Sequence, residues 1–321
     1  MVDKNFKNTA YLFPGQGAQY PGMAVDLLLS SDNVRQLFDT ASEIFNQNIK
    51  DVLESDADNL KRTDVSQPAI TVANLAAAAF LDDMGFSPAA AAGFSLGEYA
   101  ALVCAGIIDT AVCFRLIKKR GAAMQKAADR LSAGSAAPGM AAVIGLSPDN
   151  AEQLILRWQA EGLKDIYAAN INSPKQLVVS GTAAALAEAE TRFKEAGAKR
   201  VIRLQVAGPF HSPLVSEAAD EFAHDLKAAE FRDPVIPIFS NVTGKKISTG
   251  EEAKELALKQ ITSPVRWTDI EQSIALLPGI GACLEAGPGK VLQGLWKDTG
   301  SGIPVFAAGT KEDILKLGEN S

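Results

Sequence analysis

The chain has 321 residues, of which 47% are hydrophobic and 21% are charged. This composition predicts a folded globular protein with a sizeable core, and it excludes a disordered chain or a disulfide scaffold. The net charge of -7 gives no electrostatic footprint for binding nucleic acid or an anionic membrane. Three cysteines in apolar surroundings, no signal-peptide pattern and only short apolar stretches predict a cytoplasmic protein without membrane spans.

Strands and helices are expected to alternate in the first part of the chain. The expected elements are a buried strand at 9–13, a helix at 65–83, a strand at 89–94, a helix at 96–106 and a helix from 109. The glycines and the proline at 14–17 predict a tight turn after the first strand. Asp109 and Thr110 are expected to cap the last of these helices, which carries Arg115 and Arg120.

A segment at 131–139, rich in Ser, Ala, Gly and Pro, has the composition of a linker. After it we expect a strand at 140–146, a helix at 148–161, strands at 165–170 and 176–180, a helix at 182–196 and a strand at 200–206. This β-α-β-β-α-β order is typical of a ferredoxin-like domain. Further strands near 236–240 and 281–285 would return to the first unit. We therefore expect an α/β fold in which a small domain, residues 135–204, is inserted in a large one, residues 1–134 and 205–321.

Ser95 lies between two glycines, after a predicted strand and before a predicted helix. This is the context of a nucleophile elbow, in which glycines allow strand and helix to approach and leave the serine exposed at the helix N-terminus. The pentapeptide alone is a weak signal, and the alternative is a tight turn with a capping serine. In this context it predicts a nucleophile in an α/β-hydrolase-like large domain. Glu98 falls in the first helical turn, where the dipole stabilises a carboxylate, so a structural role is favoured.

A serine nucleophile needs a base, and the chain has two histidines. His224 falls within a predicted amphipathic helix and is expected on the surface. His211 stands between Gly-Pro-Phe and Ser-Pro, on a constrained loop after a strand, where catalytic groups tend to be placed. We therefore expect His211 to be the base.

Two glycine-rich segments resemble nucleotide-binding motifs but do not match them. The segment 287–290 follows Leu284, where a phosphate loop needs glycine. The segment 15–17 is followed by Tyr20, where the dinucleotide fingerprint needs its third glycine. Since no cluster of Cys, His and acidic residues has metal-ligand spacing, we expect no metal or redox cofactor.

Seven stretches with a specific order and spacing carry a family resemblance. They are 13–19, 93–98, 120–125, 172–181, 209–212, 260–267 and 285–292. Together they resemble the malonyl-CoA:acyl carrier protein transacylase family over nearly the whole chain. The resemblance implies a ping-pong transfer in which Ser95 takes malonyl from coenzyme A and passes it to the phosphopantetheine thiol of an acyl carrier protein. Malonyl-CoA is then a substrate, and the partner protein carries the phosphopantetheine.

The resemblance also implies which groups stabilise the oxyanion and which group orients the base. The backbone N–H of Leu96 and one near Gln16 would form the oxyanion hole. A main-chain carbonyl in the neighbourhood of Gln260 would orient His211. Gln260 itself is also expected in the substrate site. The catalytic groups would then be a Ser-His dyad without a third acid.

Three further positions bear on which acyl group is accepted. Arg120 matches the family's ligand for the substrate carboxylate. An arginine suits this role because a planar guanidinium can donate two parallel hydrogen bonds to a carboxylate. Phe210 resembles the version of a related polyketide acyltransferase motif that goes with malonyl over methylmalonyl, although its bulk could simply pack. Phe94 stands where the commoner pattern has histidine.

Three functions remain open from the sequence. The first is the malonyl transferase of type II fatty acid synthesis. The second is a free-standing polyketide-type acyltransferase or acyl hydrolase with the same dyad. The third is a non-catalytic binding module that keeps the fold.

Overall fold

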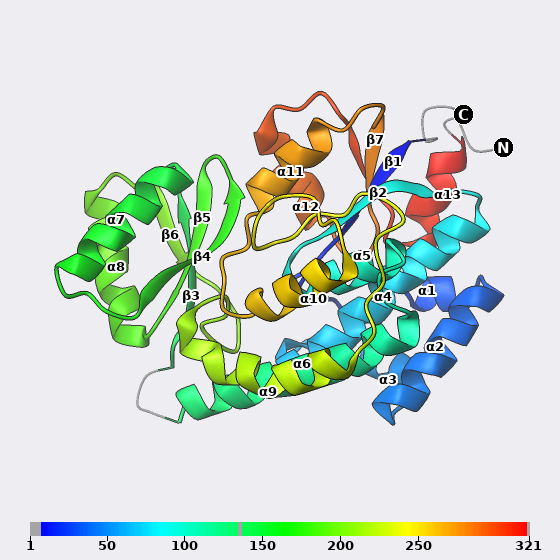
Figure 1. The fold of residues 1–321 in the computed structure, drawn as a ribbon, viewed down its shortest axis with the longest axis horizontal. Helices are drawn as coiled ribbons and strands as arrows, with labels where there is room; N and C mark the ends of the chain where they lie inside the picture. The colour runs from blue at the N-terminus through cyan, green and yellow to red at the C-terminus, as the bar shows by residue number, and fades with distance from the viewer. Residues whose placement is uncertain (1–7, 134–136, 320–321) are drawn as a thin grey trace.

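The computed structural model describes residues 8–133 and 137–319. Their strands form two separate sheets, one parallel and one antiparallel, each with helices packed against it (Figure 1). The predicted α/β fold with two kinds of sheet is confirmed. The boundaries predicted for the two domains stay predictions, and the predicted linker at 131–139 lies partly outside the described residues.

The parallel sheet has the strand order β2-β1-β7-β8. Its strands are β1 (Thr9–Phe13), β2 (Pro88–Gly93), β7 (Ala282–Glu285) and β8 (Val305–Ala307). Strand β1 is central and buried along its whole length, and after Thr9 its side chains are apolar or aromatic. Phe13 pairs with Gly93, and the turn at 14–17 therefore leaves the sheet at the same edge as Ser95.

Most of the helices pack around the parallel sheet (Figure 1). They are α1 (Val25–Leu28), α2 (Asp32–Phe45), α3 (Ile49–Leu53), α4 (Thr63–Asp83), α5 (Glu98–Cys104), α6 (Thr110–Leu131), α9 (Ser216–Ala228), α10 (Gly250–Lys259), α11 (Trp267–Ala275), α12 (Val291–Trp296) and α13 (Lys311–Glu319). Short 3-10 turns are η2 (Asn59–Lys61), η3 (Ser95–Gly97), η4 (Pro213–Val215) and η5 (Lys297–Thr299). Helix α4 is buried along most of its length, because its alanines let α2 and α6 pack closely on it. Across the described ranges, no helix is long and apolar enough to cross a membrane.

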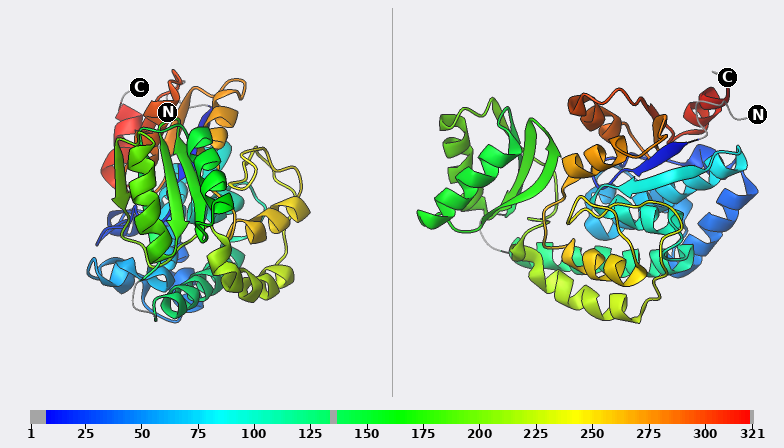
Figure 2. Two further views of the ribbon diagram at one scale, coloured as in Figure 1. Left: turned by 90° about the vertical axis from the view of Figure 1, so that its left-hand side faces the viewer. Right: turned by 45° about the horizontal axis from the view of Figure 1, so that its top comes forward.

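The antiparallel sheet has the strand order β4-β5-β3-β6. Its elements are β3 (Gly139–Ile144), α7 (Pro148–Ala160), β4 (Ile166–Ser173), β5 (Gln176–Gly181), α8 (Ala183–Glu195) and β6 (Arg200–Arg203). Both helices pack on the outer face of this sheet (Figure 2). They enclose a core of their own, in which Trp158 packs edge to face on Phe193. This is the predicted ferredoxin-like arrangement.

Backbone hydrogen bonds join β4 to the part of the chain that carries the parallel sheet. The N–H of Ile171 donates to the carbonyl of Val265 at 2.8 Å, and the N–H of Val265 donates to the carbonyl of Ala169 at 2.9 Å. The Thr268 hydroxyl on α11 donates to the carbonyl of Ile171. The two sheets are therefore fixed to one another beside the cleft that lies between them.

Two local predictions are wrong. Residues 236–240 form isolated bridges through Ile238 and Phe239 and no strand, because Pro237 has no N–H to donate to a ladder. Asp109 stands at the N-cap of α6, but its side chain makes no cap and accepts a hydrogen bond from Arg232 instead.

Candidate active site

Ser95 occupies a sharp turn between β2 and α5. Its φ of 50° lies in the left-handed region, which is uncommon outside glycine. A Cβ added to Gly93 would lie 2.0 Å from the backbone of Gly97, and one added to Gly97 would lie 2.1 Å from the Phe13 carbonyl oxygen. Only glycine fits at both positions, so the turn is the predicted elbow.

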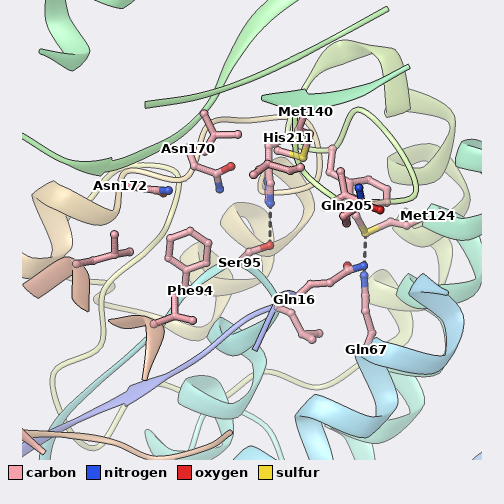
Figure 3. Close-up of a pocket in the computed structure, with 18 of the residues that line it drawn as sticks. Gln16, Gln67, Phe94, Ser95, Met124, Met140, Asn170, Asn172, Gln205 and His211 are labelled. Carbon is pink, nitrogen blue, oxygen red and sulfur yellow. Dashed lines mark hydrogen bonds between the residues drawn. The ribbon is translucent and has the colours of Figure 1, made fainter. Parts of the chain in front are cut away.

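The Ser95 hydroxyl lies opposite His211. Oγ of Ser95 is 2.7 Å from Nε2 of His211 (Figure 3). Nδ1 of His211 is 2.9 Å from the carbonyl oxygen of Gln260. A carbonyl oxygen only accepts, so Nδ1 carries the proton and Nε2 is left to accept from the serine. His211 itself has a φ of 57°. The other histidine, His224, is exposed on α9, as predicted.

A hydrogen bond from the antiparallel sheet holds the loop of the base. The Ser180 hydroxyl on β5 donates to the carbonyl oxygen of Phe210, the residue before His211. The Ser212 hydroxyl donates to the carbonyl of Pro209 at 2.6 Å, which closes the turn on the other side. The strained backbone of His211 is therefore fixed from two directions.

The dyad opens into a cleft of about 370 Å³ between the two sheets (Figure 3). Apolar side chains from both parts, Met124, Met140 and Val178 among them, line much of it. Gln16 and Leu96 lie at its wall, and in the described part of the chain the Gln16 N–H donates to no acceptor. All seven predicted site residues, Gln16, Ser95, Leu96, Arg120, Phe210, His211 and Gln260, lie at this cleft or contact a residue that does.

Arg120 is a fully buried cation that reaches the cleft from α6. Its Nη2 donates to Oε1 of Gln260 at 2.9 Å, and its guanidinium lies over the Tyr99 ring, 5.5 Å from the centroid. Burial lowers the pKa of Arg120, while the fields of Tyr99 and Glu98 oppose this shift. Nε of Arg120 is buried without a hydrogen-bond partner among the described residues. The site thus holds a donor for an anionic group.

The Gln260 side chain connects the cation to the nucleophile turn. Its Nε2 donates to the carbonyl of Ser95 at 3.0 Å and to Oε2 of Glu98 at 2.7 Å, while its Oε1 accepts from Arg120. The same residue supplies the carbonyl that faces His211. Gln260 is therefore shared by the base, the nucleophile turn and the cation.

Asn241 is a positioning residue that the sequence analysis missed. Its Oδ1 accepts from the N–H of Ser95 at 2.6 Å, and its Nδ2 donates to the carbonyl of Gly93 at 2.7 Å. Its own N–H donates to Oε2 of Glu98 at 3.1 Å. The available signal was its place just after 236–240, since residues at the carboxyl edge of a parallel sheet gather at its site.

Comparison with known proteins agrees with this geometry. A family model described as an acyl transferase domain matches residues 10–313. The chain belongs to this family.

Named relatives share nearly the whole length of the chain. A malonyl CoA-acyl carrier protein transacylase of Bacillus subtilis is 37% identical over 308 residues, which cover 95% of this chain and 94% of that one. The crystal structure of a Streptococcus pneumoniae enzyme, MCAT, superposes with a TM-score of 0.91 at 33% identity, covering 98% of this chain and 100% of that one. A malonyl-transacylase solved with a type II polyketide acyl-carrier protein superposes with a TM-score of 0.89 at 34% identity, covering 98% and 100%.

Within this acyl transferase family, the environment of Phe94 explains how the chain accommodates its departure from histidine. The Phe94 ring lines the cleft and packs edge to face on Trp267, 5.4 Å between centroids. An aromatic pair of this kind contributes about 0.5 to 1.5 kcal/mol beyond its burial. Position 94 is therefore an apolar wall of the cleft. Phe210 also lines the cleft and is buried, and its effect on methylmalonyl stays a prediction.

The acyl transferase should keep a neutral base well into the acid range. Burial, and next the charge of Arg120, lower the pKa of His211 to about 4. Since the base must be neutral, we expect kcat/KM on the acid side to stay level down to about pH 5 and to fall below it, where an unperturbed histidine would give a fall near 6.5. The initial rate of acyl transfer, measured from pH 4 to 8 with circular dichroism as a check on folding, tests this; an acid limb near pH 6.5 would contradict it.

The lowered pKa of His211 also makes the stability of the folded chain depend on pH. Between about pH 4 and 6.5 the unfolded chain binds a proton at His211 that the folded chain does not. The stability that this histidine contributes is therefore present above about pH 6.5 and is lost as the pH falls toward 4.

Proposed function

We propose that the chain is a malonyl-CoA:acyl carrier protein transacylase of type II fatty acid synthesis. Relatives that share nearly its whole length carry that name, and one structural neighbour is a malonyl-transacylase in complex with an acyl-carrier protein. The observation that carries the proposal is the Ser95-His211 dyad in one cleft with a buried guanidinium that has an unpartnered donor. A nucleophile, a base and a carboxylate ligand are the groups that malonyl transfer needs.

In the first half-reaction, Nε2 of His211 takes the proton of the Ser95 hydroxyl as Oγ attacks the thioester carbonyl of malonyl-CoA. The backbone N–H groups of Leu96 and Gln16 stabilise the oxyanion, and one such donor typically contributes about 3 kcal/mol. The carbon–sulfur bond then breaks, and the coenzyme A thiolate leaves with the proton from His211. This step leaves a malonyl ester on Ser95.

In the second half-reaction, the phosphopantetheine thiol of the carrier protein loses its proton to His211 and attacks the ester. Ser95 leaves as an alkoxide and recovers that proton from His211. Because the Gln260 carbonyl accepts from Nδ1, it keeps the ring in the orientation that both half-reactions use.

Arg120 binds the malonyl carboxylate and sets the acyl preference. An acyl group without a carboxylate leaves a donor of the buried guanidinium without a partner, and an unsatisfied buried hydrogen-bonding group costs about 1 to 3 kcal/mol. The residues that perform these steps are the chain's own, and we propose that neither a metal nor a redox cofactor takes part. Operation in the cytoplasm, where acyl carrier protein and coenzyme A thioesters meet, belongs to the same proposal.

Intact-protein mass spectrometry after brief mixing with malonyl-CoA tests the proposal. Wild type should gain one malonyl group and lose it on addition of the holo form of acyl carrier protein, whereas Ser95→Ala should gain none. Loss of the adduct to water as fast as to the carrier would favour the acyl hydrolase. No adduct from malonyl-, acetyl- or methylmalonyl-CoA would overturn the proposal and favour a binding module.

A further inference from the structure

Glu98 is a buried carboxyl group beneath the dyad for which the reaction above has no use. It is 1% exposed, and its Oε2 accepts hydrogen bonds from Gln260 and Asn241. Its Oε1 is buried with no hydrogen-bond partner among the described residues. A helix dipole alone does not account for a carboxyl group held this far from water.

The Gln260 amide lies between Glu98 and Arg120. Its oxygen faces the guanidinium and its nitrogen faces the carboxyl group, at 2.9 and 2.7 Å. This is the orientation that a cation on one side and an anion on the other select. In the empty site, the charge of Glu98 therefore balances that of Arg120 through one side chain.

The other titratable groups around this pair are uncharged near neutral pH. Burial raises the pKa values of Tyr99 on α5 and Cys113 on α6, and burial lowers that of His211 on its loop. When the malonyl carboxylate reaches Arg120, the buried site therefore holds two negative charges and one positive charge. A net buried charge is costly, and the group that can relieve it is Glu98.

We propose that Glu98 balances the charge of Arg120 in the empty site and takes up a proton when the malonyl carboxylate binds there. The proton comes from solvent and forms an O–H bond on Oε1, the oxygen that accepts no hydrogen bond. An acyl group without a carboxylate leaves Glu98 ionised. The inference rests on the proposed function. Glu98 would act through Gln260 and Arg120, without touching the reacting atoms, and would keep the net charge of the buried site unchanged when malonyl binds.

The energetics of the carboxyl group agree with this exchange. Burial is the largest cause that raises the pKa of Glu98 to about 7, while hydrogen bonds from Gln260 and Asn241 and the charge of Arg120 oppose the rise. A carboxyl group poised there gains or loses its proton at little cost near neutral pH. A second anion at Arg120 removes part of the opposing field, and the pKa of Glu98 then rises further.

The first test measures proton uptake in a single turnover, with a pH indicator in weak buffer at about pH 8. Formation of the malonyl enzyme should take up close to one more proton per molecule in wild type than in Glu98→Gln. Because both enzymes release the same amount of coenzyme A thiol, the ionisation of that thiol cancels in the difference. Glu271→Gln is the matched control, because Glu271, like Glu98, is a buried acid with one oxygen that has no hydrogen-bond partner among the described residues. It should take up as many protons as wild type.

The second test uses the pH dependence of KM. Malonyl-CoA binding that requires a protonated Glu98 makes KM rise above about pH 7.5, by up to tenfold per pH unit, in wild type and in Glu271→Gln. In Glu98→Gln the rise should be absent, whereas a merely structural role would change KM equally at every pH.

The outcomes separate this inference from the proposed function. An adduct confirmed by mass, with equal proton uptake in wild type and Glu98→Gln, would overturn the inference alone. The absence of a malonyl adduct in wild type would overturn both. If Glu98→Gln forms no adduct, the comparison of wild type with malonyl-CoA and with acetyl-CoA decides, since only the malonyl group should draw a proton.

Discussion

Replacement of His211 by alanine should lower kcat for malonyl transfer by about 10⁵- to 10⁶-fold. In the described part of the chain the Ser95 hydroxyl is hydrogen-bonded to no group other than His211, so the serine loses its proton acceptor. Losing one member of a catalytic unit costs nearly as much as losing all of them, which sets this magnitude. Stopped-flow measurement of coenzyme A release gives the rate constant.

The chain provides a matched control in its second histidine. His224→Ala removes the same side chain from the exposed face of α9, so kcat should match that of wild type within about twofold. A His211→Ala enzyme that retains a tenth of the wild-type rate would show that another group accepts the proton.

Replacement of Arg120 by alanine should remove the preference for malonyl. We expect kcat/KM for malonyl-CoA to fall by about 10²- to 10³-fold, since a carboxylate held in a desolvated pocket then lacks its charged donor. The value for acetyl-CoA should stay the same or rise, because no guanidinium donor is then left without a partner in the cleft. Competition between the two thioesters, resolved by mass on the Ser95 adduct, measures the ratio directly.

Two further variants make that result specific. Arg115→Ala removes an exposed arginine from the same helix and should leave the ratio unchanged. Arg120→Lys keeps the charge but loses the planar fork, so it should recover only part of the preference. An unchanged ratio in Arg120→Ala would assign carboxylate recognition to another group.

The dyad, the antiparallel sheet and the strands β1, β2 and β7 were predictable because local sequence determines them, whereas β8 was not predicted. The glycines around Ser95 are needed for a close backbone approach, and the strand and helix that meet there have clear periodicity. Only two histidines exist, and the loop of His211 distinguishes it from His224. The order of elements in the small sheet followed from the same periodic patterns.

The polar residues around the dyad could not be assigned from local sequence. Asn241 and the Gln260 side chain reach Ser95 from 146 and 165 residues away, and their bonds depend on how loops pack at the sheet edge. A glutamate in the first turn of a helix is common whether the helix end is exposed or buried. Only the fold shows that Glu98 is buried. The failed prediction of a strand at 236–240 has a different and local origin, because Pro237 stands inside the apolar run and removes an N–H from the ladder.

The hydrogen bond from Ser180 to the Phe210 carbonyl ties the loop of His211 to the antiparallel sheet, whereas Ser95 follows a strand of the parallel sheet. The 2.7 Å contact of the dyad is therefore a measure of how the two sheets are aligned. Displacement of a catalytic group by about 1 Å can cost 10²-fold in rate. A displacement of β5 against the parallel sheet would therefore lower activity even with both cores folded, and we expect heating to inactivate the enzyme before either core unfolds.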